Sequence, residues 1–99
     1  MSYRVDLKLE AHQDIFEAML WYESKREGLG AEFYAEVEKV KKTLAINPDI
    51  FEVKYKKNVR WLQTERFPYI VVYVIKGDNV VILAVVSTHR HPKIWKGRS

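Results

Sequence analysis

The residue types best suited to chemistry gather at the end of the chain, in STHRHPKIWKGRS (residues 87–99), which has no carboxylate side chain. A histidine side chain titrates near neutrality and can give or take a proton. Arginine stays charged and can hold two oxygens of one phosphate group, and an indole ring can stack on a nucleic-acid base. We therefore expect the tail to contribute to an anion-binding surface through His89, Arg90, His91, Lys93, Trp95 and Lys96.

Further basic residues precede the tail, namely Lys54, Lys56, Lys57, Arg60 and Arg66. All but one of them have even numbers, as Arg90 does, so a regular pleat would place these cations on the same side of a sheet. Such a cluster predicts a site for phosphate or for an acidic partner. The alternative for Lys54 and Lys56 is that they discourage strand pairing at a sheet edge. The alternative for Arg90 is a solvated charge or a salt bridge.

Charge is divided unevenly along the chain, although the formal net charge is only +4. Residues 1–49 carry seven Lys and Arg against ten Asp and Glu, whereas residues 50–99 carry ten against three. A polarised field of this kind attracts polyanions or an acidic partner. The alternative is an ordinary basic surface that keeps the protein in solution.

Several functional classes are excluded by what the chain lacks. Without cysteine there is no disulfide framework, no cysteine-bound zinc and no thiol catalysis. Gly28 and Gly30 do not form a phosphate-binding loop, His12 is isolated, and Glu36 and Glu38 point apart on a helix, so we expect no metal and no cofactor. With no signal peptide and no apolar segment of membrane length, we expect a cytoplasmic protein without membrane association.

Hydrophobic periodicity predicts the elements that position these residues. Alternation over 3–8 predicts a strand, and apolar residues three and four apart predict helices over 11–26 and 31–46. The tight connection EGLG joins the helices, and Asn47-Pro48 ends the second one. Three successive strands follow, from alternation over 51–61 and from apolar runs at 67–75 and 80–86.

Together these elements predict one α+β domain spanning residues 1–99. An N-terminal strand is followed by an antiparallel helical hairpin and a three-strand antiparallel meander, with the helices packed on one face of the sheet. The central strands are apolar on both faces, so the face opposite the helices would have no cover within the chain. Exposed apolar area of that size marks a candidate docking surface.

Three stretches carry a family resemblance, at residues 12–51, 59–75 and 80–98. They contain, in order, a helix with WYE, an LG break, NP after the second helix, Arg-x-x-x-x-x-Arg-Phe-Pro-Tyr, and His-Arg-x-Pro-x-x-Trp. The chain resembles the RelE/ParE superfamily of toxins from bacterial type II toxin–antitoxin modules, and within it the branch of plasmid-stabilisation proteins. The resemblance covers nearly the whole chain and implies the same helical hairpin on a small antiparallel sheet.

The resemblance implies a growth-inhibiting toxin that a short, acidic antitoxin neutralises. RelE-like members cut mRNA in the ribosomal A site without a metal, whereas ParE-like members inhibit DNA gyrase and are not known to be nucleases. We expect first a ribosome-dependent mRNA endonuclease. In it Arg90, Arg60 and Arg66 would hold the scissile phosphate, and His89 or His91 would transfer protons.

One departure from the RelE-like pattern keeps two alternatives open. Those nucleases commonly carry a tyrosine, sometimes a histidine, in the C-terminal segment, where this chain has Trp95. An indole is no proton donor of useful acidity, so proton transfer would fall to the histidines. A ParE-like gyrase inhibitor without nuclease activity is therefore the first alternative, and a non-toxic binding module with a toxin-like fold is the second.

Overall fold

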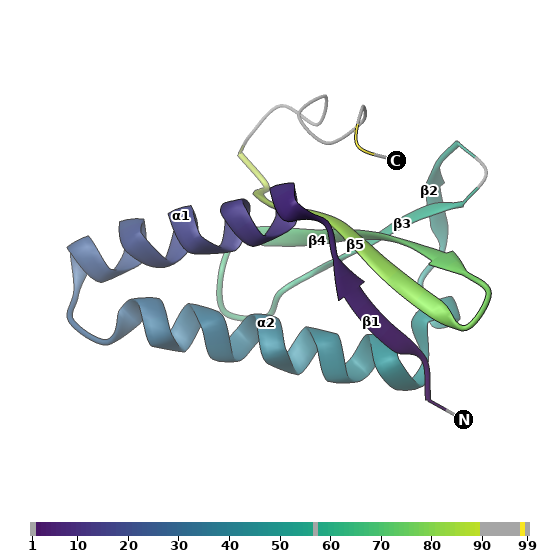
Figure 1. The fold of residues 1–99 in the computed structure, drawn as a ribbon. Helices are drawn as coiled ribbons and strands as arrows, with labels where there is room; N and C mark the ends of the chain where they lie inside the picture. The colour runs from purple at the N-terminus through teal and green to yellow at the C-terminus, as the bar shows by residue number, and fades with distance from the viewer. Residues whose placement is uncertain (1, 57, 90–97, 99) are drawn as a thin grey trace.

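The computed structural model describes residues 2–56, 58–89 and 98, which form a five-stranded sheet with two helices on one face (Figure 1). The elements in chain order are β1 (Arg4–Leu7), α1 (Leu9–Lys25), α2 (Leu29–Ile46), the 3-10 helix η1 (Pro48–Ile50), β2 (Val53–Tyr55), β3 (Val59–Gln63), β4 (Tyr69–Lys76) and β5 (Asn79–Ser87). The sheet order is β1-β5-β4-β3-β2, in which β1 runs parallel to β5 and the other neighbours are antiparallel. The predicted α+β class is confirmed. Within the described ranges, neither helix is long and apolar enough to cross a membrane.

The connection between the helices is held by a carboxylate at the end of α1. Glu23 accepts hydrogen bonds from the backbone N–H groups of Gly28 at 2.9 Å and Gly30 at 3.0 Å. These bonds keep the pKa of Glu23 below its ordinary value, because they stabilise the charged carboxylate. Gly28 has a φ of 87°, and a Cβ on Gly30 would lie 2.7 Å from the Met19 carbonyl oxygen. Both glycines of the predicted break are therefore required by the backbone.

The main core lies between the helical hairpin and the sheet. It is formed by the predicted apolar stripes of both helices and by one face of the central strands, from residues that include Ala11, Ile15, Ala18, Phe33, Val37, Val40, Leu44, Val71, Tyr73, Val80 and Ile82. Tyr73 is fully buried, and its hydroxyl donates a hydrogen bond to the Pro48 carbonyl oxygen at 2.5 Å. Burial raises the pKa of Tyr73 to about 12.

Two local features of the sheet differ from the prediction. The segment 51–61 is not one strand, because the chain reverses at Lys56, whose φ is 51°, and β2 pairs antiparallel with β3. In β5 an extra residue is inserted, since Val72 lies opposite Ala84 but Tyr73 lies opposite Ile82. This bulge exchanges the faces of odd- and even-numbered residues between the two halves of β5.

The expectation of an uncovered apolar face opposite the helices is wrong. Val59, Val72, Val74, Leu83, Ala84 and Val86 form a second core cluster on that face, and all of them are buried. The partly buried aromatic side chains of Tyr55 and Trp61 pack against this cluster. The hairpin of β2 and β3 thus contributes two aromatic side chains to this second cluster, which the sequence pattern of a single strand did not predict.

Candidate functional site

Arg60 lies on the helix side of the sheet and bonds to the chain itself. It is opposite Tyr73 in the β3–β4 register, and directly opposite residues of an antiparallel pair share a face. Its guanidinium donates hydrogen bonds to the carbonyl oxygens of Asp49, within η1, and Phe51, directly after it. The expectation that Arg60 and Lys54 share one side of the sheet is wrong, because Lys54 lies next to Trp61, which packs on the opposite face. Residue parity does not carry over from one strand to another when turns and bulges intervene.

Arg66 is also engaged within the chain, in the connection between β3 and β4. Its guanidinium lies 2.6 Å from a carboxylate oxygen of Glu32 on α2, and the other oxygen of Glu32 accepts a bond from Arg26 at 3.1 Å. The pKa of Glu32 is lowered first by the hydrogen bond from Arg66 and then by that from Arg26. Arg60 and Arg66 therefore do not converge on one phosphate-binding face. Of their predicted partners, Lys57, Arg90, His91, Lys93, Trp95 and Lys96 lie outside the described residues.

The hairpin of β2 and β3 carries the remaining predicted cations, each next to an aromatic ring. The Lys54 ammonium lies 5.7 Å from the ring centroid of Trp61, and the Lys56 ammonium lies 5.5 Å from that of Tyr55. Lys54 is also 3.3 Å from a carboxylate oxygen of the exposed Glu52. Exposed pairs of this kind are weak and exchangeable. We call Lys54, Tyr55, Lys56 and Trp61 the hairpin surface. This surface can attract an anionic partner without holding a single phosphate in a fixed geometry.

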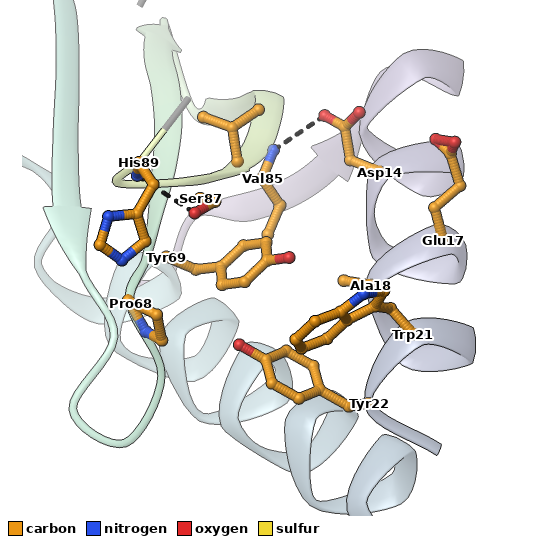
Figure 2. Close-up of a pocket in the computed structure, with 11 residues that line it drawn as sticks. Asp14, Glu17, Ala18, Trp21, Tyr22, Pro68, Tyr69, Val85, Ser87 and His89 are labelled. Atoms are coloured by element: carbon orange, nitrogen blue, oxygen red, sulfur yellow. Dashed lines mark hydrogen bonds between the residues drawn. The ribbon is translucent and has the colours of Figure 1, made fainter. Parts of the chain in front are cut away.

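A cleft of about 450 Å³ lies between α1 and the adjoining ends of β4 and β5 (Figure 2). One wall is formed by the α1 side chains Glu17, Trp21 and Tyr22, and the other by residues Pro68, Tyr69, Ser87 and His89. The volume is in the range of small-ligand sites. Of its lining residues, only His89 was predicted as a site residue.

The aromatic side chains of the cleft are fixed by the core beneath it. The Tyr22 ring stacks on Phe33 at 5.4 Å and lies 5.9 Å from the Tyr69 ring, so both tyrosines pack against the core and also line the cleft. Burial, and then the nearby Tyr69, raises the pKa of Tyr22. The His89 backbone N–H donates to the Ser87 hydroxyl at 3.1 Å (Figure 2). The phenol groups of Tyr22 and Tyr69 suit hydrogen bonding and stacking.

Asp14, at the inner end of the cleft, is committed to structural bonds. One carboxylate oxygen accepts the Val85 backbone N–H at 3.0 Å and lies 2.6 Å from the Arg98 guanidinium. Arg98 also donates to the Leu83 carbonyl oxygen, while its own carbonyl oxygen accepts a bond from Lys8. The Asp14 and Arg98 side chains are only 13% and 17% exposed. This ion pair joins the first helix, the bulge of β5 and residue 98, which are distant in sequence.

Over the part of the chain that the structure describes, the side chains are arranged for binding more than for proton transfer. No group of three or more His, Asp or Glu residues in that part could hold a metal ion. Arg60 and Arg66, two of the three arginines expected at the scissile phosphate, bond to partners within the chain. What remains accessible is the hairpin surface and the aromatic cleft with its Glu17 carboxylate.

The fold is that of toxins from toxin–antitoxin systems. A chain of the chromosomal ParDE toxin–antitoxin system of P. aeruginosa superposes with a TM-score of 0.77 at 17% identity, covering 87% of this chain and 96% of that one. An arginine-to-alanine double variant of E. coli toxin RelE in the free state gives 0.69 at 14% identity, over 90% and 86%. A chain of the toxin–antitoxin complex RelBE2 of Mycobacterium tuberculosis gives 0.64 at 20% identity, over 88% and 99%.

The sequence comparison identifies the family. Residues 5–92 match the ParE toxin of the type II toxin–antitoxin system parDE. The chain therefore belongs to the ParE toxin family, within the RelE/ParE superfamily that the sequence motifs indicated, and is the toxin of a type II toxin–antitoxin system. Among curated proteins, no sequence matches this chain significantly.

Proposed function

We propose that this toxin acts by binding and inhibiting DNA gyrase and does not cleave RNA. The observation that carries the proposal is the engagement of Arg60 and Arg66. Arg60 is held by the carbonyl oxygens of Asp49 and Phe51, and Arg66 is held by Glu32. Metal-free RNA cleavage needs a cation aimed at the developing charge on phosphorus, whereas both guanidiniums are directed at partners within the chain. The absence of a tyrosine from the tail supports the same conclusion.

We further propose that a cognate antitoxin neutralises the toxin by covering its accessible surfaces. The ParDE system of P. aeruginosa and the RelBE2 complex of M. tuberculosis are toxin–antitoxin assemblies with the same fold. The exposed Lys54 and Lys56 of the hairpin surface favour a partner segment rich in carboxylates. A toxin directed at gyrase acts in the cytoplasm, where both its target and its antitoxin are found.

The ribosome-dependent mRNA endonuclease remains the second candidate, supported by the hairpin surface. Its lysines and aromatic rings are groups that bind the backbone and bases of single-stranded RNA. In that case Arg90, His89 and His91 would supply the chemistry. A toxin-like protein that only binds its partner is the third possibility, and viable cells on expression of the lone chain would favour it.

The test is induction of the chain in bacterial cells without its antitoxin, with two readouts from the same culture. Primer extension on a translated message reports mRNA cuts, and trapping of protein-linked DNA breaks reports gyrase. We expect growth arrest, gyrase-linked breaks and intact mRNA, and no change in these effects for Arg66→Ala. Ribosome-dependent mRNA cuts that vanish in Arg90→Ala would overturn the proposal in favour of the endonuclease. Coexpression of the antitoxin, which we expect to be encoded by the adjacent reading frame, should restore growth.

A further inference from the structure

The strand β1 lies at one margin of the sheet, and within the described ranges no strand pairs with its outer edge (Figure 1). Its inner edge pairs in parallel with β5. On that inner side the backbone N–H groups of Arg4 and Lys8 donate to carbonyl oxygens. Because the backbone groups of successive residues alternate between the two edges of a strand, those of Tyr3, Val5 and Leu7 face outward.

Most of these outward backbone groups have no bond within the described part of the chain. The Tyr3 N–H donates to the Ala45 carbonyl oxygen near the end of α2 at 2.6 Å. The described backbone bonds outside the strand ladders do not include the N–H groups of Val5 or Leu7. A row of unpaired backbone groups is a template for a further strand. We call residues 3–7 the β1 edge, and it is a candidate interface.

Two opposite charges lie on one face of the β1 edge. Arg4 and Asp6 are two residues apart and therefore share a face of the strand. Their side chains are 75% and 43% exposed, and the Arg4 Nε lies 3.2 Å from a carboxylate oxygen of Asp6. An exposed pair of this kind contributes little to stability. Either side chain can therefore exchange its partner for the same group on another molecule at little cost.

Charge decides which strand fits this edge. If two copies of the chain pair antiparallel about Val5, the Arg4 of each copy lies opposite the Asp6 of the other. These two residues then occupy the closely spaced, non-hydrogen-bonded positions of the ladder, where opposite charges are favourable. Pairing about Arg4 or about Asp6 would instead set like charges against each other, which is repulsive. Charges that normally protect a sheet edge thus favour the register centred on Val5 over its neighbours.

Exposed apolar side chains lie at both ends of the β1 edge. Leu9 begins α1 shortly after β1, and Ile46 ends α2 next to Ala45; the two side chains are 69% and 64% exposed. Antiparallel pairing brings the carboxyl end of each β1 to the amino end of the other. Leu9 of one copy then approaches Ile46 of the second copy, and two-fold symmetry repeats this contact. The same arrangement therefore covers apolar surface as well as backbone groups.

We propose that the toxin without its antitoxin associates as a two-fold symmetric dimer through the β1 edge, with Arg4 of each copy paired to Asp6 of the other. The two sheets join into one continuous sheet, and the hairpin surfaces lie at its far ends, because β2 is the strand most distant from β1. Such an interface is small, so we expect a dissociation constant on the order of 10–100 µM. The inference does not depend on the target of the toxin.

Sedimentation equilibrium of the lone chain, made by cell-free synthesis, tests the dimer from about 1 µM to about 300 µM. We expect the mass to rise from that of a monomer toward that of a dimer. Asp6→Arg and Arg4→Asp each set like charges against each other and should each weaken association at least tenfold. The matched control Glu27→Arg reverses an exposed charge in the turn between the helices, and it should leave association within about twofold.

An equimolar mixture of the two charge-reversed variants tests the register. In Arg4→Asp both charged positions of the β1 edge are acidic, and in Asp6→Arg both are basic, so each variant repels itself but complements the other. We expect the mixture to associate at least as tightly as the parent chain. Two variants with the urea unfolding of the parent that fail to associate when mixed would show that positions 4 and 6 do not face each other, and would overturn the proposal.

The parent chain and the control variant provide two further outcomes. A parent chain that stays monomeric at the highest concentration would overturn the dimer and leave the β1 edge to a strand of another protein. Loss of association in Glu27→Arg equal to that in Asp6→Arg would mean that association follows net charge alone, which contradicts the interface. Failure to inhibit gyrase, by contrast, would refute the proposed function without changing the sedimentation result.

Discussion

Replacement of Arg60 by methionine tests whether this arginine holds the fold or serves a phosphate. Arg60→Met keeps an unbranched side chain of similar length but removes the guanidinium that bonds to the carbonyl oxygens of Asp49 and Phe51. The bond to Phe51 is partly buried, and a hydrogen bond from a charged donor contributes about 1.5–3 kcal/mol. The bond to Asp49 is exposed and adds less. We expect the free energy of unfolding to fall by about 2–3 kcal/mol.

The assay is urea unfolding followed by tryptophan fluorescence, with two companion variants. Arg60→Lys retains the charge but replaces the planar guanidinium with a single ammonium group, and should lose about 1–2 kcal/mol. Lys76→Met removes an exposed cation from the end of β4, and should change stability by less than about 0.5 kcal/mol. A variant Arg60→Met as stable as the parent chain would refute the structural role and return Arg60 to the candidates for phosphate binding.

Three further predictions concern the supports of the site. Gly30→Ala should lower the free energy of unfolding by about 1–3 kcal/mol in urea unfolding, because a Cβ would lie 2.7 Å from a carbonyl oxygen of α1; a neutral effect would contradict the close helix contact. The pKa of Glu32 lies below its ordinary value of 4.5, chiefly because of Arg66, so its contribution to stability is present above that pH and is lost as the pH falls through the lower folded-state value. Unfolding measured from about pH 6 to about pH 3 should therefore show a shallower acid loss in Glu32→Gln than in the parent, and parallel pH profiles would argue against the ion pair. Tyr73→Phe should reduce stability by about 1–2 kcal/mol, because the Pro48 carbonyl oxygen loses a buried partner, and equal urea midpoints would contradict that bond.

The helices and the sheet could be predicted from the sequence because each rests on local patterns. The fold of the helical hairpin follows from the apolar stripes of α1 and α2, from the EGLG connection and from the proline after α2. The centre of the sheet follows from the apolar runs of β4 and β5. The reversal at Lys56 could not be predicted in this way. A lysine with φ of 51° has no turn signature of its own, and alternation continues across the break.

The composition of the site was less predictable, because it depends on contacts between distant residues. The even residue numbers of Arg60 and Arg90 predicted that both lie on one face of the sheet. Residue numbers indicate a shared face only within one strand, and in β5 the bulge exchanges the faces of odd- and even-numbered residues. The Asp14–Arg98 pair joins residues 84 positions apart, which no local pattern specifies. The cleft had one signal in the sequence, the adjacent Trp21 and Tyr22 on a helix, of which only the second belongs to the core stripe.

We propose that this toxin inhibits by binding, and a supercoiling assay with purified DNA gyrase tests the proposal without the complexity of a living cell. Relaxed plasmid, gyrase and ATP are incubated with increasing amounts of the chain, and the products are separated by electrophoresis. We expect supercoiling to be lost, or cleaved plasmid to accumulate, in proportion to the chain added. We expect the cognate antitoxin to reverse the effect. Normal supercoiling at a large excess of chain, together with cut mRNA in a translating extract, would contradict it.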